Sequence, residues 1–151
     1  MSAISPTNII LDSSVIAKWF FPSEQDSEIA LKIRDLFLSH ELSISVPILI
    51  YYEINNLLRT ATKRLRISKD LAKEAYQGFL DLELVAYSSK ELMEMALEKA
   101  VLLDISSYDA SYVVLAEYLQ IPLISADQKL VDKTKTHFVQ NLQNISSTIK
   151  L

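Results

Sequence analysis

Four acidic residues stand at positions from which their carboxylates are expected to lie near one rim of the fold: Asp12, Glu53, Asp109 and Asp127. Asp12 and Asp127 each follow a short apolar run, Asp109 begins an apolar helical stretch, and Glu53 lies roughly two helical turns beyond a third run. Like charges that share a cleft raise one another's pKa unless a cation is present, and Mg²⁺ or Mn²⁺ prefers carboxylate and water oxygens. Such a centre activates water and stabilises charge on a phosphodiester.

Each acid also has a purely structural interpretation. Asp12 and Asp127 are typical helix N-caps, and Ser106 with Asp109 fits a capping box in which the acid satisfies backbone N–H groups. Glu53 fits the outer face of an amphipathic helix. Taken one at a time, these interpretations are the more frequent, so the metal hypothesis depends on the four acids acting together.

The composition removes most other chemistries. The chain has no Cys, which excludes disulfides, iron–sulfur clusters and Cys-ligated zinc. Its single glycine, Gly78, is too few for a phosphate-binding glycine loop, and two histidines, His40 and His137, are too few for a three-His zinc site. Carboxylates are abundant, with 19 Asp and Glu against 15 Lys and Arg for a net charge of −4.

Short apolar runs alternate with helical patterns along the chain, which favours an α/β domain with a mainly parallel sheet. The predicted strands are 8–11, 42–46, 83–86 and 121–124, and the predicted helices are 27–39, 47–64, one capped by Ser68, 89–103, 107–119 and a short one after Asp127. Pro47 is expected in the first turn of its helix, and residues 137–151 as one more strand and a polar tail. With neither a repeat nor a linker, residues 1–151 are expected to form one domain. Ligands of such sheets bind beyond the carboxyl ends of the strands.

The segments around the four acids resemble a known family. Ile9-Ile10-Leu11-Asp12-Ser13-Ser14-Val15-Ile16-Ala17-Lys18-Trp19 resembles the opening motif of the PIN-domain ribonucleases, and the VapC toxins are the branch that it resembles most. The segments 46–58, 107–117 and 122–130 resemble the second, third and fourth motifs, in order. The resemblance covers about residues 8–130. Ser125 stands where the family more often has Thr, and Asp104 is an additional acid before the third motif.

The resemblance implies a three-layer α/β sandwich with a central, mainly parallel sheet. It also implies that Asp12, Glu53, Asp109 and Asp127 bind Mg²⁺ or Mn²⁺ and cleave single-stranded RNA, with the hydroxyl of Ser14 supporting Asp12. A homodimer and a small antitoxin protein that inhibits this toxin are the implied partners.

Basic residues gather after the second motif. Arg59, Lys63 and Arg66 are expected on one helical face beyond Glu53, where they are candidates for contacts to RNA phosphates. A solvated helix end explains the same cluster equally well. Tyr52 and Tyr108 flank site acids, and for them packing and ligand contact both remain open.

The sequence predicts a cytoplasmic protein without a membrane span. It has no run of 18 apolar residues, and no basic residue before Lys18 that would mark a signal peptide. A mean hydropathy of +0.18 indicates apolar surface that a subunit or partner covers.

Two other functional classes share features with this sequence. A non-catalytic PIN-like module that binds RNA or protein is the main alternative, although all four acids are present. A phosphotransfer or phosphatase domain fits poorly, because the segment after the first strand lacks the second Asp of a D-x-D-x-T motif.

Overall fold

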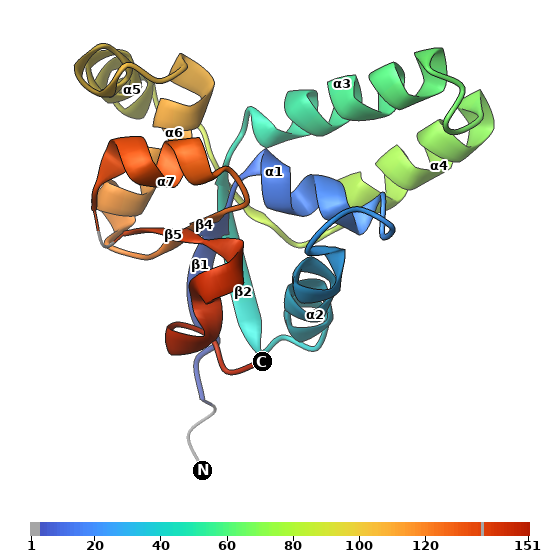
Figure 1. The fold of residues 1–151 in the computed structure, drawn as a ribbon, viewed down its shortest axis with the longest axis horizontal. Helices are drawn as coiled ribbons and strands as arrows, with labels where there is room; N and C mark the ends of the chain where they lie inside the picture. The colour runs from blue at the N-terminus through green and yellow to red at the C-terminus, as the bar shows by residue number, and fades with distance from the viewer. Residues whose placement is uncertain (1–3, 137) are drawn as a thin grey trace.

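The computed structural model describes residues 4–136 and 138–151, and a five-stranded parallel sheet forms its centre (Figure 1). His137 lies outside the described residues. The strands are β1 (Thr7–Leu11), β2 (Leu42–Pro47), β3 (Val85–Tyr87), β4 (Leu123–Ser125) and β5 (Val139–Asn141). Their order across the sheet is β3-β2-β1-β4-β5, and every neighbouring pair is parallel. The predicted parallel α/β sheet is therefore confirmed.

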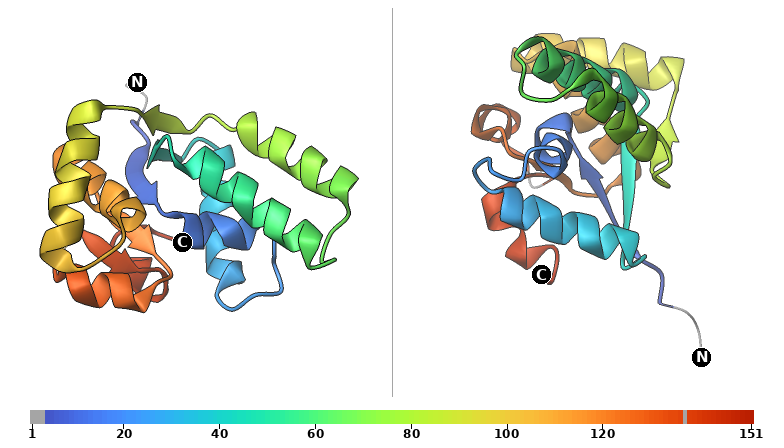
Figure 2. Two further views of the ribbon diagram at one scale, coloured as in Figure 1. Left: turned by 90° about the horizontal axis from the view of Figure 1, so that it is seen from above. Right: turned by 90° about the vertical axis from the view of Figure 1, so that its right-hand side faces the viewer.

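Helices cover both faces of this sheet. They are α1 (Ser13–Ile16), α2 (Ser27–Leu38), α3 (Ile50–Lys63), α4 (Lys69–Leu80), α5 (Lys90–Leu103), α6 (Ser107–Leu119) and α7 (Gln128–Thr134), with 3₁₀ helices η1 (Ala17–Trp19) and η2 (Leu142–Ser147). Crossovers between parallel strands are right-handed, so the connections from β1 to β3 and those from β3 to β5, which run in opposite directions, place their helices on opposite faces. Figure 2 shows α5 and α6 across the strands from α3 and α4, and the three-layer sandwich is confirmed.

The core explains why some elements are apolar on every side. Ile9, Ile10 and Leu11 of β1 are fully buried, because helices cover both faces of the strand. Helix α6 packs against β1, β2 and β4 on one side and against α5 on the other. Its residues 112–116 are all buried, so this helix has no solvent-facing stripe in its central turns.

Two expectations about local structure were wrong. Pro47 ends β2 rather than opening a helix, and α3 begins at Ile50. The β1 register ends at the pair Ile10–Ser45, so the missing N–H of Pro47 costs no bond to that neighbour. The expected polar tail is also wrong, because Ile145 of η2 and Ile149, two residues beyond its end, lie in the core.

Within the described part of the chain, no helix is both long and apolar enough to cross a membrane.

Candidate active site

The strand order changes direction between β1 and β4, and the acids lie around this edge of the sheet. From β1 the chain proceeds outward to β2 and β3, and it later returns to place β4 on the other side of β1. In open α/β sheets the ligand crevice lies outside the carboxyl ends of the strands at this switch point. Asp12 directly follows β1, and Asp127 follows β4 by two residues.

Asp12 is the most deeply placed of the four acids, with 3% of its surface exposed. It is the N-cap of α1, and its Oδ1 accepts the backbone N–H groups of Ser14 at 3.1 Å and Val15 at 3.3 Å and the hydroxyl of Ser14. Burial raises the pKa of Asp12 to about 6, with a smaller increase from the charge of Asp109, against hydrogen bonds from Ser125 and Ser14 that lower it. Among the described residues, no Lys or Arg forms an ion pair with this carboxylate.

Two serines tie the ends of β1 and β4 together. The hydroxyl of Ser14 accepts the backbone N–H of Ala126 at 3.0 Å while it donates to Asp12. The hydroxyl of Ser125 accepts the N–H of Asp127 at 3.0 Å. Ser14 therefore links Asp12 to the residue that follows β4, and its role in a functional site stays a prediction.

Glu53 reaches the same edge from the first turn of α3. Its Oε1 accepts the hydroxyl of Tyr112 at 2.6 Å, and its Oε2 accepts the hydroxyl of Ser13 at 3.0 Å. Burial raises the pKa of Glu53, and the charge of Asp109 adds to that increase, while the two hydroxyls lower it. The interpretation of Glu53 as an outward-pointing surface residue is wrong.

The remaining two acids are more open to solvent. Asp109, in the first turn of α6, is half-buried, and burial raises its pKa with a further contribution from the charge of Asp127. Asp127 is exposed, and its Oδ1 accepts the N–H groups of Lys129 at 2.9 Å and Leu130 at 3.4 Å as the N-cap of α7. The capping roles of Asp12 and Asp127 are confirmed, and they orient the two carboxylates at the sheet edge.

An open cleft of about 920 Å³ lies in front of these acids. Glu53, Asp109 and Asp127 line it, together with residues of α1 and one face of α3. Tyr52 and Tyr108 also line the cleft with 80% and 67% of their surfaces exposed, so neither is a packing residue.

The carboxylate oxygens of the four acids are suitable ligands for a hard divalent cation, although the side chains are not close enough together to bind one ion in this arrangement. Among the described residues, no three Asp, Glu or His side chains lie close enough together to hold one ion as they stand. Even so, the charge of Asp109 raises the pKa of Asp12 and of Glu53, and the charge of Asp127 raises that of Asp109. The four acids at this edge offer carboxylate oxygens, and such ligands select Mg²⁺ or Mn²⁺ over softer metals.

The basic residues lie on another side of α3. Arg59 and Lys63 line a groove between α3 and α4 together with Lys69 and Lys73, and the cleft does not include them. Among the described residues, none of these four forms an ion pair.

Arg66 does not share that helical face, so this expectation was wrong. Helix α3 ends at Lys63, and Leu65 adopts a left-handed conformation with φ of 57°, so helical spacing no longer applies beyond it. The guanidinium of Arg66 instead pairs with Glu24 at 3.4 Å and lies 4.2 Å from the centre of the Phe21 ring.

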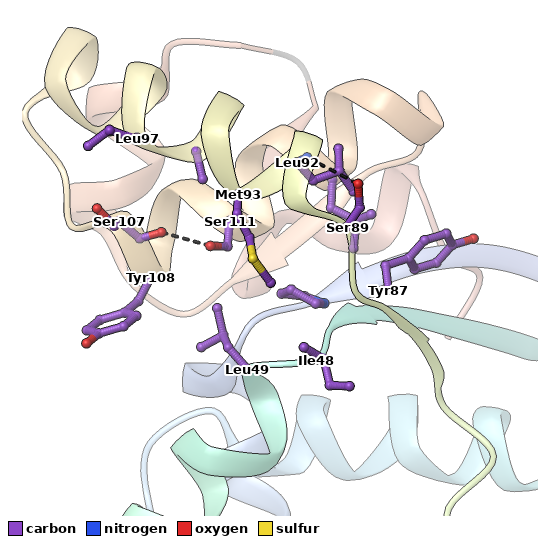
Figure 3. Close-up of a pocket in the computed structure, with 13 residues that line it drawn as sticks. Ile48, Leu49, Tyr87, Ser89, Leu92, Met93, Leu97, Ser107, Tyr108 and Ser111 are labelled. Atoms are coloured by element: carbon purple, nitrogen blue, oxygen red, sulfur yellow. Dashed lines mark hydrogen bonds between the residues drawn. The ribbon is translucent and has the colours of Figure 1, made fainter.

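A smaller apolar groove of about 260 Å³ adjoins the cleft, since Leu49 and Tyr108 line both. Figure 3 shows Met93 of α5 pointing across this groove toward Leu49 and Ile48. Along the exposed side of α5, Met93, Leu97 and Val101 have 56%, 60% and 77% of their surfaces exposed.

Sequence reasoning missed Ser13 and Tyr112, which contact Glu53. A hydroxyl inside the otherwise apolar run 112–116 of a buried helix was the available signal, because a buried tyrosine usually has a hydrogen-bond partner. The additional acid Asp104 is not part of the site: it ends α5 in a left-handed conformation, and its Oδ2 lies 3.5 Å from the Nζ of Lys133.

The chain matches a known family over most of its length. The PIN domain family model matches residues 9–135, which contain all four acids. The chain belongs to the PIN domain family. Within it the chain is VapC-like: it is 36% identical over 89 residues to Ribonuclease VapC9 of Mycobacterium tuberculosis, which covers 59% of this chain and 68% of that protein. It is 26% identical over 129 residues to Ribonuclease VapC3 of Pyrobaculum aerophilum, which covers 83% of this chain and 93% of the relative.

Solved structures show the same PIN fold. The crystal structure of PAE2754 from Pyrobaculum aerophilum matches with a TM-score of 0.64 and 22% identity, over 94% of this chain and 95% of that one. VapBC-1 from nontypeable Haemophilus influenzae also has a TM-score of 0.64, with 15% identity over 91% of this chain and 100% of that one.

Proposed function

We propose that this PIN-domain protein is a Mg²⁺- or Mn²⁺-dependent endoribonuclease that hydrolyses phosphodiester bonds of single-stranded RNA, as the toxin of a toxin–antitoxin pair. The observation that carries the proposal is the acid-lined cleft at the β1–β4 switch point, in a chain whose relatives are named VapC ribonucleases. We place the whole site within one domain at residues 1–151, whose main hydrophobic cluster includes residues from Ile9 to Ile149.

In this proposal Asp12, Glu53, Asp109 and Asp127 are the metal ligands and catalytic residues. A bound divalent cation supplies Lewis-acid activation of water and stabilisation of the charge that develops on the phosphate. The protein holds the ligands in place beforehand: Ser14 and the start of α1 orient Asp12, and the start of α7 orients Asp127. Burial is the main cause that raises the pKa of Asp12, Glu53 and Asp109, with a smaller contribution from neighbouring acids, and such perturbed carboxyls in a cleft are typical of functional sites.

RNA would be held by two further sets of residues. The exposed rings of Tyr52 and Tyr108 at the cleft are placed to stack on unpaired bases. Arg59 and Lys63 lie in the cationic groove between α3 and α4. There they would contact the backbone phosphates of RNA that extends beyond the cleft. An RNA substrate also agrees with the cytoplasmic location expected from the sequence.

Two protein partners complete the proposal. Structural relatives include VapBC-1 from Haemophilus influenzae and a toxin–antitoxin complex from Klebsiella pneumoniae, which supports a small antitoxin as a partner. The exposed apolar residues of α5 beside the groove of Figure 3 support a homodimer through that face. Sedimentation of wild type against Leu97→Glu tests the dimer, which should dissociate in the variant.

The test of activity is cleavage of a mixed pool of single-stranded RNA with Mg²⁺ or Mn²⁺, with EDTA, and with Asp12→Asn. The proposal expects cleavage by the wild type with metal, and none with EDTA or in the variant. Cleavage that survives both changes would overturn the metal mechanism.

One observation favours the alternative of a non-catalytic RNA- or protein-binding module. No three described carboxylates converge closely enough to hold an ion as they stand. Calorimetry with Mn²⁺ at neutral pH separates the two, because the binding module should retain RNA without binding metal.

A further inference from the structure

The Glu53 carboxylate is held at two points by two different elements. Tyr112 of α6 donates its hydroxyl to Oε1 at 2.6 Å, and Ser13 of α1 donates its hydroxyl to Oε2 at 3.0 Å. Each carboxylate oxygen has two lone-pair directions, so each oxygen keeps one for another partner. Glu53 also lines the cleft, where that other partner would lie.

The tyrosine hydroxyl is not explained by packing. Tyr112 is 1% exposed, and its neighbours on α6 from Val113 to Ala116 are all apolar and buried. A phenylalanine would fill the same space without bringing a polar group into the core, which is costly unless that group is hydrogen-bonded. The one hydrogen bond recorded for this hydroxyl among the described residues is the bond to Glu53.

Within the described part of the chain, Glu53 lacks the main-chain support that Asp12 and Asp127 have. Asp12 and Asp127 are short side chains whose Oδ1 atoms accept backbone N–H groups at helix starts, so the main chain orients them. Glu53 has a longer side chain with more rotamer freedom to lose, and both of its recorded hydrogen bonds come from side chains.

We propose that Tyr112 and Ser13 are positioning residues that hold the Glu53 carboxylate toward the cleft and thereby raise the affinity of the site for a divalent cation. This inference rests on the proposed function, because it assumes that the cleft binds metal. Hydrogen-bond partners of metal ligands elsewhere contribute roughly 10- to 100-fold to metal affinity or activity, and we expect an effect of that size here.

The experiment measures Mn²⁺ affinity by calorimetry on the RNA-free protein, and the Mn²⁺ dependence of RNA cleavage. The variants are Tyr112→Phe, which removes one oxygen atom, and Ser13→Ala, with Ser13→Thr as a rescue that restores a hydroxyl. The controls are Tyr118→Phe, an exposed tyrosine on the same helix, and Ser43→Ala, a half-buried serine near the start of β2.

We expect Tyr112→Phe and Ser13→Ala each to weaken Mn²⁺ binding by about 10- to 100-fold. Cleavage should recover at high Mn²⁺, Ser13→Thr should bind like the wild type, and the controls should not change. A merely structural role would lower Tm without this shift in metal dependence. If Tyr112→Phe fails to fold, the comparison of Ser13→Ala with Ser13→Thr tests the positioning role by itself.

The two hypotheses fail in different ways. If the wild type binds no Mn²⁺, the proposed function fails. If the wild type binds Mn²⁺ and Glu53→Gln weakens it, but Tyr112→Phe and Ser13→Ala retain wild-type affinity within about twofold, the positioning role is overturned while the proposed function stands.

Discussion

Helix α3 separates two regions of opposite charge. One face carries Glu53, Asn56 and Thr60 into the cleft where the acids gather, and another carries Arg59 and Lys63 into the groove with α4. Asp12 and Glu53 are buried and half-buried and are held by hydrogen bonds, whereas Arg59 and Lys63 are exposed and form no ion pair among the described residues. A buried, oriented group is suited to chemistry, and an exposed, mobile cation is suited to holding a phosphate chain at long range.

The comparison also changes how the net charge is understood. The chain has a net charge of −4, which by itself argues against a nucleic-acid partner. The four proposed metal ligands equal that excess in number, and the bases concentrate in a separate groove. The distribution of charge therefore matters more here than its sum.

The largest expected effect is the loss of RNA cleavage when one of the four acids is replaced. Asp12→Asn keeps an oxygen that accepts the capping bonds of α1 but removes the negative charge. Since even the partners of metal ligands contribute roughly 10- to 100-fold, loss of a ligand should lower the cleavage rate by at least about 100-fold. Single-turnover RNA cleavage measures it, with Asp104→Asn outside the site as the matched control. A cleavage rate near that of the wild type would show that Asp12 is not a catalytic metal ligand.

The same substitution should have the opposite effect on stability. The folded-state pKa of Asp12 is raised to about 6 from 3.8, so the folded protein binds its proton more tightly than the unfolded chain. This stabilisation is fully present below about pH 4 and is lost as the pH rises through 6, and Glu53 and Asp109 shift in the same direction.

At pH 7 without metal, Asp12→Asn should therefore raise the free energy of unfolding by up to about 3 kcal/mol. Denaturant unfolding at pH 5 and pH 7 in EDTA measures the effect, which should be smaller at pH 5. A variant that is less stable than the wild type at pH 7 would contradict this electrostatic account. Added Mn²⁺ should stabilise the wild type at pH 7 and leave the variant nearly unchanged.

How far the sequence predicts this molecule depends on the kind of feature. The order of strands and helices follows from local apolar patterns, and the family motifs placed Asp12, Glu53, Asp109 and Asp127 at the same edge of the sheet. The end of β2 at Pro47 and the buried residues Ile145 and Ile149 were missed, because register and tertiary burial decide them rather than local pattern.

Side-chain contacts between segments that are distant in the sequence could not be predicted from it. Tyr112 lies 59 residues from Glu53, and nothing in their spacing indicates that their side chains meet. Arg66 shows the reverse error: its helical spacing from Lys63 suggested a shared face, but the helix ends before it. Whether the four acids and Arg59 and Lys63 perform their proposed roles remains a prediction.

A smaller effect is expected from the basic side. Arg59→Ala combined with Lys63→Ala should weaken binding of single-stranded RNA and lower the slope of log affinity against log salt by about 0.7 for each lost phosphate contact. Mn²⁺ affinity should not change. The matched control is Lys32→Ala with Lys150→Ala, which removes the same charge elsewhere. An equal loss in both double variants would indicate a general charge effect and no specific groove.

The smallest effect is expected for Arg66→Ala. Its pairing with Glu24 and its position over Phe21 are at the surface, where such contacts contribute about 1 kcal/mol or less. Thermal unfolding should show a slight loss, with RNA affinity unchanged. RNA binding that falls as far as in the Arg59 and Lys63 double variant would show that Arg66 belongs to the basic region after all.

The most direct measurement of the central claim is the position of a bound metal. Crystals of the protein grown with Mn²⁺ would be examined for anomalous scattering at the edge between β1 and β4. The account predicts a peak in the cleft within coordination distance of carboxylate oxygens from Asp12, Glu53, Asp109 and Asp127, and its loss in Asp12→Asn. An empty cleft at saturating Mn²⁺, or a peak elsewhere with RNA cleavage intact, would contradict it.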